Sequence, residues 1–234
     1  MAKIFRYELK RLLCSKLTIG LLVVIGFYSH WLMNREVILG IANTAPFSPW
    51  SFGYYLAKLL PLLMLALLFF ISFLYSKKEK KVEILTSATG VKPSKYRMVR
   101  YAAIGTAALL ITAVPILYAI GFYRIVFHFS KMQTLILPAI YVILPAFAIW
   151  MGAGVLSGRL HPAAVFILMP AALLVGFLPL HGWADLYGTA FWVSYPAELG
   201  MLDPVFEVPT QMVICKAVYL LIGFILTIIA AKRH

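Results

Sequence analysis

The feature that most constrains this chain is a series of six long stretches dominated by apolar residues. The hydrocarbon core of a membrane is about 30 Å thick, and a helix needs about 20 mostly apolar residues to cross it. Stretches of this length are too long for barrel strands, and backbone polar groups in lipid must be paired within their own segment. We therefore expect an all-α membrane protein with six transmembrane helices, at residues 17–39, 54–75, 102–123, 132–157, 160–180 and 212–231.

The composition is typical of a membrane protein, and the meaning of the high net positive charge depends on that class. Hydrophobic residues make up 63% of the 234 residues and charged residues 12%, against roughly 45–50% and about 25% in soluble domains. The net charge is +13, which in a soluble chain would suggest a nucleic-acid partner. The two cysteines, Cys14 and Cys215, do not make a disulfide framework, and we expect free thiols.

The distribution of positive charge predicts the topology. With the amino terminus in the cytoplasm, 16 of the 21 Lys and Arg fall on the inner side and five of the eight acids fall on the outer side. This excess is the pattern of the positive-inside rule, so we expect both termini in the cytoplasm, a location in the plasma membrane and no nucleic-acid partner. Three outer cations are placed by helix length at the headgroup level, either as snorkelling anchors or as a basic ring at an exit mouth: Arg35, Lys58 and Lys216.

Residues 1–16 are expected to form an amphipathic helix on the inner membrane surface before the first span. Apolar residues recur with helical spacing at Phe5, Leu9, Leu12 and Leu13, while Lys and Arg occupy the opposite face. Simple membrane anchoring is one interpretation of this helix. A cuff that also contacts a cytoplasmic partner is the other.

The exterior is expected to be structured. Residues 34–53 and 181–211 are rich in aromatic residues, as in the belt at a membrane interface. For the second segment we expect a short interfacial or re-entrant helix over Ala184–Ser194, with an irregular loop as the alternative. Gly154 and Gly158 form a small-residue motif that we interpret as helix packing only.

Several kinds of chemistry are missing from the sequence. The cores of the six spans hold no Asp or Glu, which disfavours a proton-coupled carrier. Metalloprotease, serine-hydrolase and P-loop motifs are also absent. We therefore expect no enzyme activity, no catalytic or metal-binding residues and no cofactor bound by this chain.

The loop 76–101 carries the most specific signal. Lys77–Lys81 extends the second span into water, and Val82–Ala88 is expected to form a short helix with apolar side chains exposed to the cytoplasm. Gly90 and Pro93 are suited to end that helix, and Ser94 is suited to cap the helix that leads into the third span. One interpretation is a coupling helix, and the other is a solvated basic connector.

At these residues the chain resembles the membrane subunits of ABC-2 type exporters. Such subunits carry, between the second and third spans, a segment of the form Glu-x-Leu-x-x-Ser/Ala-x-Pro/Gly-Val followed by Tyr-x-x-x-Lys/Arg. The opening residues Phe5–Arg11 are similar to the connecting helix of that family. The chain departs from many members by a glycine in place of proline. The matching residues are Glu83, Leu85, Ser87 or Ala88, Gly90, Val91, Tyr96 and Arg100.

The resemblance implies the permease subunit of an ATP-driven exporter for a hydrophobic or amphipathic substrate such as a peptide, an antibiotic or a lipid. It implies two copies of an ABC ATPase subunit, which would hold ATP and Mg, and either a second copy of this chain or a sister permease. A non-transporting membrane sensor or scaffold that docks a partner through the same loop is the alternative. The residues implied in coupling to the ATPase are Val82, Glu83, Ile84, Leu85, Thr86 and Ser87.

Overall fold

The computed structural model describes residues 1–76, 79, 93–178, 180 and 182–232. Within these residues the chain is helical and contains no strand. The helices are α1 (Ala2–Leu13), α2 (Lys16–Arg35), η1 (Val37–Leu39), α3 (Pro49–Leu74), α5 (Pro93–Val126), η2 (Met132–Leu135), α6 (Ile136–Leu160), α7 (Pro162–Phe177), η3 (Gly182–Ala184), α8 (Phe191–Glu198) and α9 (Thr210–Lys232).

Among the described residues, five helical segments are long and apolar enough to cross a membrane, and this confirms a multi-pass helical membrane protein. A sixth expected span, residues 160–180, contains α7, which has 16 helical residues. At 1.5 Å per residue α7 is about 24 Å long, shorter than the hydrocarbon core. The five segments are Lys16–Leu39, Pro49–Leu74, Pro93–Val126, Met132–Leu160 and Thr210–Lys232.

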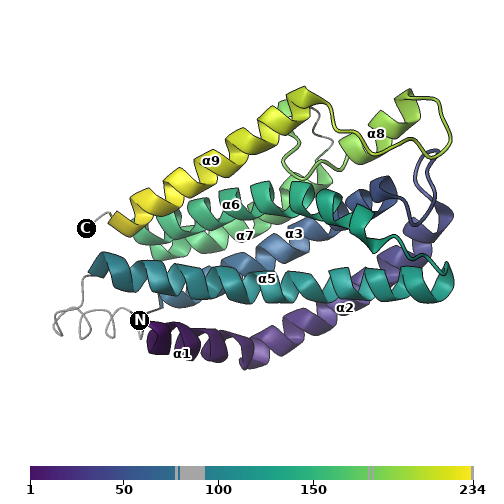
Figure 1. Ribbon diagram of the computed structural model, residues 1–234. Coiled ribbons are helices and arrows are strands. Elements are labelled where there is room, and N and C mark those ends of the chain that lie inside the picture. The colour runs from purple at the N-terminus through teal and green to yellow at the C-terminus, as the bar shows by residue number, and fades with distance from the viewer. Residues whose placement is uncertain (77–78, 80–92, 179, 181, 233–234) are drawn as a thin grey trace.

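The helices form an elongated bundle around α3 (Figure 1). In the apolar stretch of α3, 61% of the residues are buried, against 17% in α9. Helix α3 packs against α5, α6 and α7, whereas α9 packs mainly on α6. Both termini lie at one end of the bundle, which we call the terminal end, and α8 lies at the other, the distal end (Figure 1).

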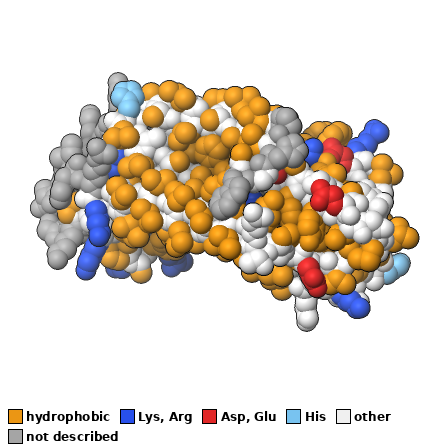
Figure 2. All heavy atoms as spheres, turned by 90° about the horizontal axis from the view of Figure 1, so that it is seen from above, with side chains coloured by type: hydrophobic (Ala, Val, Ile, Leu, Met, Phe, Trp, Pro, Cys, Tyr) orange, Lys and Arg blue, Asp and Glu red, His pale blue; other side chains and the backbone are white. Residues whose placement is uncertain are grey.

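Apolar and charged side chains occupy different parts of the long axis of the molecule. Hydrophobic side chains cover the middle of the face shown in Figure 2, and charged side chains lie toward the two ends, with the acidic ones at one of them. Exposed apolar residues continue along the outer faces of the spans, for example Val23 and Phe27 on α2 and Leu221 and Phe224 on α9. An apolar band between charged ends is the surface expected of a protein that sits in a bilayer.

Local capping sets where the spans begin. Ser15 accepts a hydrogen bond from the backbone N–H of Thr18 at 3.2 Å and caps α2, while the Thr18 hydroxyl donates to the carbonyl of Leu12 at 2.6 Å. These bonds fix the bend between α1 and α2. Pro93 is the first residue of α5 that the structure describes, so Ser94 lies within the helix and not before it.

Small residues allow three helices to approach one another closely. A Cβ placed on Gly223 of α9 would lie 2.2 Å from the backbone carbonyl carbon of Ala148 in α6, and one placed on Gly152 would lie 2.5 Å from the carbonyl oxygen of Gly223. Gly154 and Gly158 face α3, where the side chains of Ile71 and Tyr75 fill the space. The interpretation of the Gly154–Gly158 motif as helix packing is confirmed. Ala148 and Gly152, four residues apart, form a second pair of small residues at the tighter α6–α9 contact.

Candidate functional site

Four charged side chains meet at the terminal end, and we call them the terminal cluster. They are Glu8 and Arg11 of α1, Glu79 beyond the end of α3, and Arg100 of α5. Arg11 pairs with Glu8 at 2.7 Å and with Glu79. Arg100 pairs with Glu8 at 3.2 Å and with Glu79. Each arginine therefore bridges the same two carboxylates, and three segments distant in sequence are tied together.

Burial makes the terminal cluster more than a surface ion pair. The side chains of Arg100 and Glu8 are 4% and 6% exposed, and that of Glu79 is 12% exposed, while Arg11 keeps 33%. Exposed pairs contribute little because water screens them. Buried charges must be paired and hydrogen-bonded, and removing one partner leaves the other in a medium of low dielectric constant. The cluster should therefore hold its three segments in one fixed arrangement.

The predicted apolar face of α1 points toward the bundle. Leu12 is buried, and Leu9 and Leu13 are half-buried against the core. Phe5, the first residue of that face, is half-buried. The helix packs on α5, so α1 is attached to the bundle by apolar contacts and by the terminal cluster. The amphipathic helix predicted from the sequence is present, and its apolar side contacts protein.

The residues expected to couple to an ATPase, Val82–Ser87, lie outside the described residues. The nearest described residues on the two sides are Glu79 and Pro93. Glu79 precedes them and Arg100 follows them, and these two side chains are paired with each other. The terminal cluster thus joins the two ends of the loop to each other and to α1.

At the distal end, Lys216 is buried instead of lying exposed at a rim. Its side chain leaves α9 and its amine donates hydrogen bonds to the carbonyls of Leu186 at 2.6 Å and Asp185 at 3.2 Å. The amine also lies 5.9 Å from the ring centre of Tyr141. The residue is 6% exposed. Lys216 therefore attaches the distal segment that contains Asp185 and Leu186 to α9.

The other two cations expected at the outer surface lie in different surroundings. Arg35 is exposed at the end of α2. Lys58 is half-buried, with its amine 5.3 Å from the ring centre of Tyr54, one helical turn away. Lys216, by contrast, is turned inward, so the contacts of the three side chains do not join them in one group.

The segment 182–209, at the distal end, is folded onto the bundle by aromatic packing. The expected helix over Ala184–Ser194 is displaced in the structure: η3 covers only Gly182–Ala184, and α8 begins at Phe191. Trp192 of α8 packs edge-on against Trp50 of α3, and the Trp50 indole donates to the carbonyl of Pro204 at 3.0 Å. Trp50 therefore buries a large aromatic side chain whose N–H has a hydrogen-bond partner.

Further hydrogen bonds of two residues, Asp185 and Tyr187, hold this distal segment in place. The Asp185 carboxylate accepts hydrogen bonds from the backbone N–H groups of Gly188 at 2.6 Å and Ala190 at 3.1 Å. Tyr187 donates its hydroxyl proton to the carbonyl of Ala172 in α7 at 2.8 Å. A tyrosine hydroxyl is protonated at neutral pH even at its usual pKa of 10.0, and burial raises the pKa of Tyr187 further, so this hydroxyl remains a donor.

The sequence indicated the residues of the terminal cluster only individually. Glu8 and Arg11 are three residues apart on one helix, a spacing that favours pairing. Glu79 and Arg100 lie in the loop that the sequence singled out, yet nothing local shows that both meet α1. Acids are scarce at this end, where Glu8, Glu79 and Glu83 are the only ones on the predicted inner side. That scarcity was the available signal that these few acids have specific partners.

Comparison of the chain with protein-family models, with curated proteins and with solved structures finds no match. The function must therefore be argued from the sequence and from the geometry of the site.

Proposed function

We propose that this chain is the permease subunit of an ATP-driven exporter of the ABC-2 type. It would sit in the plasma membrane with both termini in the cytoplasm and move a hydrophobic or amphipathic substrate, such as a peptide, an antibiotic or a lipid, out of the cell. Two ATPase subunits carrying ATP and Mg would dock beneath it, and a second copy or a sister permease would complete the membrane pair.

The observation that supports this proposal best is the terminal cluster. A coupling segment must transmit a movement of the ATPase to the transmembrane helices without shifting relative to the ends of those helices. Glu79 and Arg100 flank the segment Val82–Ser87 and are paired with each other. Each also pairs with a side chain of α1, Glu79 with Arg11 and Arg100 with Glu8. A push on that segment would therefore move α1, α3 and α5 together as a unit, because buried ion pairs resist separation.

Docking would rest on the apolar side chains of this segment. Burying Ile84 and Leu85 in a groove of the ATPase contributes roughly 1.5–3 kcal/mol each. Losing both corresponds to a factor of more than about 100 in the dissociation constant. Glu83 would offer a carboxylate to a basic residue beside that groove. Closure of the ATPase pair on ATP would bring the coupling segments of the two permeases together and open the route between them.

Co-purification tests the proposal. The tagged chain is expected to retain a P-loop ATPase in mild detergent, and the double variant Ile84→Asp/Leu85→Asp is expected to lose it. The matched control is Lys80→Gln/Lys81→Gln, which changes two residues of the same loop, removes positive charge and keeps the apolar side chains. Retention of the ATPase by the aspartate variant would contradict the proposal, and equal loss by both variants would instead indicate a basic connector.

A second measurement separates an exporter from a non-transporting sensor or scaffold. In proteoliposomes, the complex of an exporter is expected to hydrolyse ATP faster when its substrate is present. A complex that forms through the same loop, but whose ATPase rate responds to none of the hydrophobic or amphipathic compounds tested, would favour the scaffold.

A further inference from the structure

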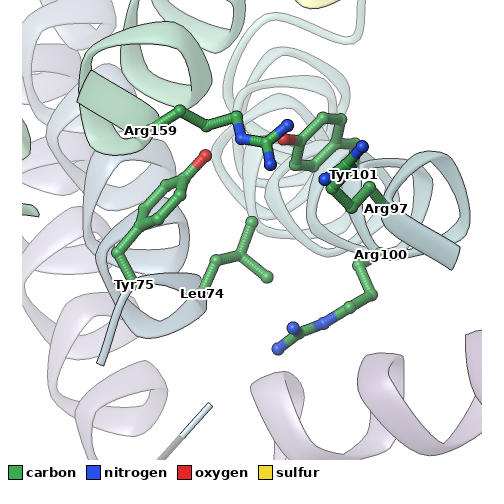
Figure 3. Close-up of a pocket in the computed structure, with 6 residues that line it drawn as sticks. All are labelled: Leu74, Tyr75, Arg97, Arg100, Tyr101 and Arg159. Atoms are coloured by element: carbon green, nitrogen blue, oxygen red, sulfur yellow. The ribbon is translucent and has the colours of Figure 1, made fainter. Parts of the chain in front are cut away.

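The pocket between the ends of α3, α5 and α6 at the terminal end is too small for an organic ligand (Figure 3). Its free volume is about 20 Å³, room for about one water molecule. In Figure 3 the guanidinium of Arg100 points away from Tyr101, toward Glu8 and Glu79, with which it pairs. A groove at the distal end, with a volume of about 210 Å³, has room for a small molecule.

This groove lies between the segment 182–198 and the start of α9, and we call it the distal groove. A second hollow of about 160 Å³ shares Gln211 and Met212 with it and reaches Cys215, so the space continues along α9. The side chains that give the distal groove its chemistry are Asp185, Phe191, Tyr195 and Glu198 on one side and Gln211 and Met212 on the other.

Two stacked rings form an apolar wall of the distal groove. Phe191 and Tyr195 of α8 stack with their ring centres 5.3 Å apart. Tyr195 also packs on Trp50 of α3, with ring centres 5.5 Å apart, so the wall is attached to the bundle. The faces of aromatic rings carry partial negative charge and attract cations. This wall therefore suits a ligand that has both an apolar part and a positive charge.

The charge of the distal groove is negative. Asp185 is 8% exposed, and its two carboxylate oxygens accept one backbone N–H each, from Gly188 and Ala190. Lys216 donates to the backbone carbonyl of Asp185, and its positive charge offsets one carboxylate. Glu198 is exposed, and within the part of the chain that the structure describes its carboxylate has no hydrogen bond or ion pair. One negative charge therefore remains for a ligand to match.

The number of ligating groups favours an organic cation over a metal ion. Calcium takes six to eight oxygen ligands, and among the described residues no three side chains of His, Cys, Asp or Glu come together. An ammonium group, in contrast, donates three hydrogen bonds and needs no fixed coordination shell. Each carboxylate oxygen of Asp185 can accept a second hydrogen bond, and both oxygens of Glu198 are available.

We propose that the distal groove binds a primary ammonium ion that carries a short apolar group. The carboxylates of Glu198 and Asp185 accept hydrogen bonds from the ammonium group, and the rings of Phe191 and Tyr195 cover the charge and the apolar group. The ammonium group can belong to a small free amine or to the headgroup of phosphatidylethanolamine, and the experiment separates these sources. The distal groove does not depend on the proposed exporter function.

Binding is tested on the purified, delipidated full-length chain in a non-ionic detergent by following the melting temperature. Hexylammonium is the main probe, and we expect it to raise the melting temperature in a saturable way. Hexyltrimethylammonium, which keeps the charge but has no N–H donor, should bind about threefold more weakly. Hexanol, which keeps the alkyl chain without the charge, should bind more weakly by about tenfold, which corresponds to about 1.4 kcal/mol.

Dioleoyl phosphatidylethanolamine, with dioleoyl phosphatidylcholine as its control, tests the lipid as the source. A shift with phosphatidylethanolamine alone, while hexylammonium has no effect, would assign the ammonium group to a lipid headgroup. Equal shifts with hexanol and hexylammonium would show simple apolar binding and would overturn the proposal. The absence of a shift with both hexylammonium and phosphatidylethanolamine would also overturn it.

Substitutions separate the distal groove from general surface charge. Glu198→Gln is expected to weaken binding of the active probe about fivefold, and the variant should fold because Glu198 is exposed and unpaired. Glu207→Gln is the matched control, since Glu207 is an exposed acid that does not line the groove. Tyr195→Leu should weaken binding more than Tyr195→Phe, which keeps the ring. Unchanged binding in Glu198→Gln, or equal weakening by Glu207→Gln, would overturn the distal groove as a site even if Tyr195→Leu does not fold.

Discussion

Removing Arg100 is expected to be among the most damaging single changes at the terminal end. In the variant Arg100→Gln, two largely buried carboxylates, Glu8 and Glu79, would share Arg11 alone, which is itself one-third exposed. At an effective dielectric constant of about 20, one ion pair at 3.2 Å has a Coulomb energy of about 5 kcal/mol. Desolvation cancels much of that energy in the intact cluster, but truncation leaves the carboxylates buried, and we expect a loss of about 3 kcal/mol.

The assay is reversible unfolding in mixed micelles with increasing sodium dodecyl sulfate, followed by tryptophan fluorescence. Arg6→Gln is the control, because Arg6 is an exposed cation of α1; it is expected to change the free energy of unfolding by less than about 0.5 kcal/mol. The double variant Arg100→Gln/Glu79→Gln restores the charge balance, leaving Glu8 with Arg11. It should therefore be destabilised by at least about 1 kcal/mol less than the sum of the two single variants.

Two results would refute this reasoning. A loss of less than about 1 kcal/mol for Arg100→Gln would mean that the charges are solvated or that the arginine is dispensable. Additive effects of Arg100→Gln and Glu79→Gln would mean that these side chains do not act on each other.

Three other variants test the packing of the spans and of the distal end. Gly223→Ala should lower the free energy of unfolding by about 1–3 kcal/mol, because its Cβ would overlap the α6 backbone. In the control Gly121→Ala the new Cβ meets open space, and the free energy of unfolding should change by less than about 0.5 kcal/mol; equal effects of the two variants would exclude a close α6–α9 contact. Lys216→Met should leave two buried carbonyls without a donor and lower the free energy of unfolding by about 2–3 kcal/mol. Amide hydrogen exchange over residues 182–199 should become faster in this variant and stay unchanged in the control Lys58→Met. Trp50→Phe removes an indole donor from a buried carbonyl and should cost about 1–3 kcal/mol, and an unchanged unfolding midpoint would show that this bond is not needed.

The spans were predictable because a membrane imposes one simple demand on sequence. Residues 17–39 and 132–157 correspond to helical segments at Lys16–Leu39 and Met132–Leu160, each within three residues at either end. Length and the absence of charge are enough for such a prediction. The segment 160–180 was predicted as a full span, but α7 covers Pro162–Phe177, because Pro162 starts the helix and the chain turns extended at Leu178.

Contacts between distant segments were not predictable in the same way. The sequence places Lys216 at the outer surface by its position along a helix, but it does not show that the carbonyls of Asp185 and Leu186 fold over it. Likewise, hydropathy identifies the apolar face of α1 and leaves open whether lipid or protein covers it. The terminal cluster required three segments to be placed relative to one another, and periodicity within one helix carries no such information.

The most direct test of the proposed exporter is to determine which end of the helical bundle contacts an ATPase. A photoreactive amino acid is introduced at position 85 in the coupling segment or, as the control, at position 202 in the distal segment, where Leu202 is 88% exposed. In membranes, irradiation is expected to link position 85 to a P-loop ATPase, with a yield that changes when ATP is added, and position 202 is expected to give no such product. A product at position 202, or none at position 85 while the complex co-purifies intact, would contradict docking through the segment Val82–Ser87.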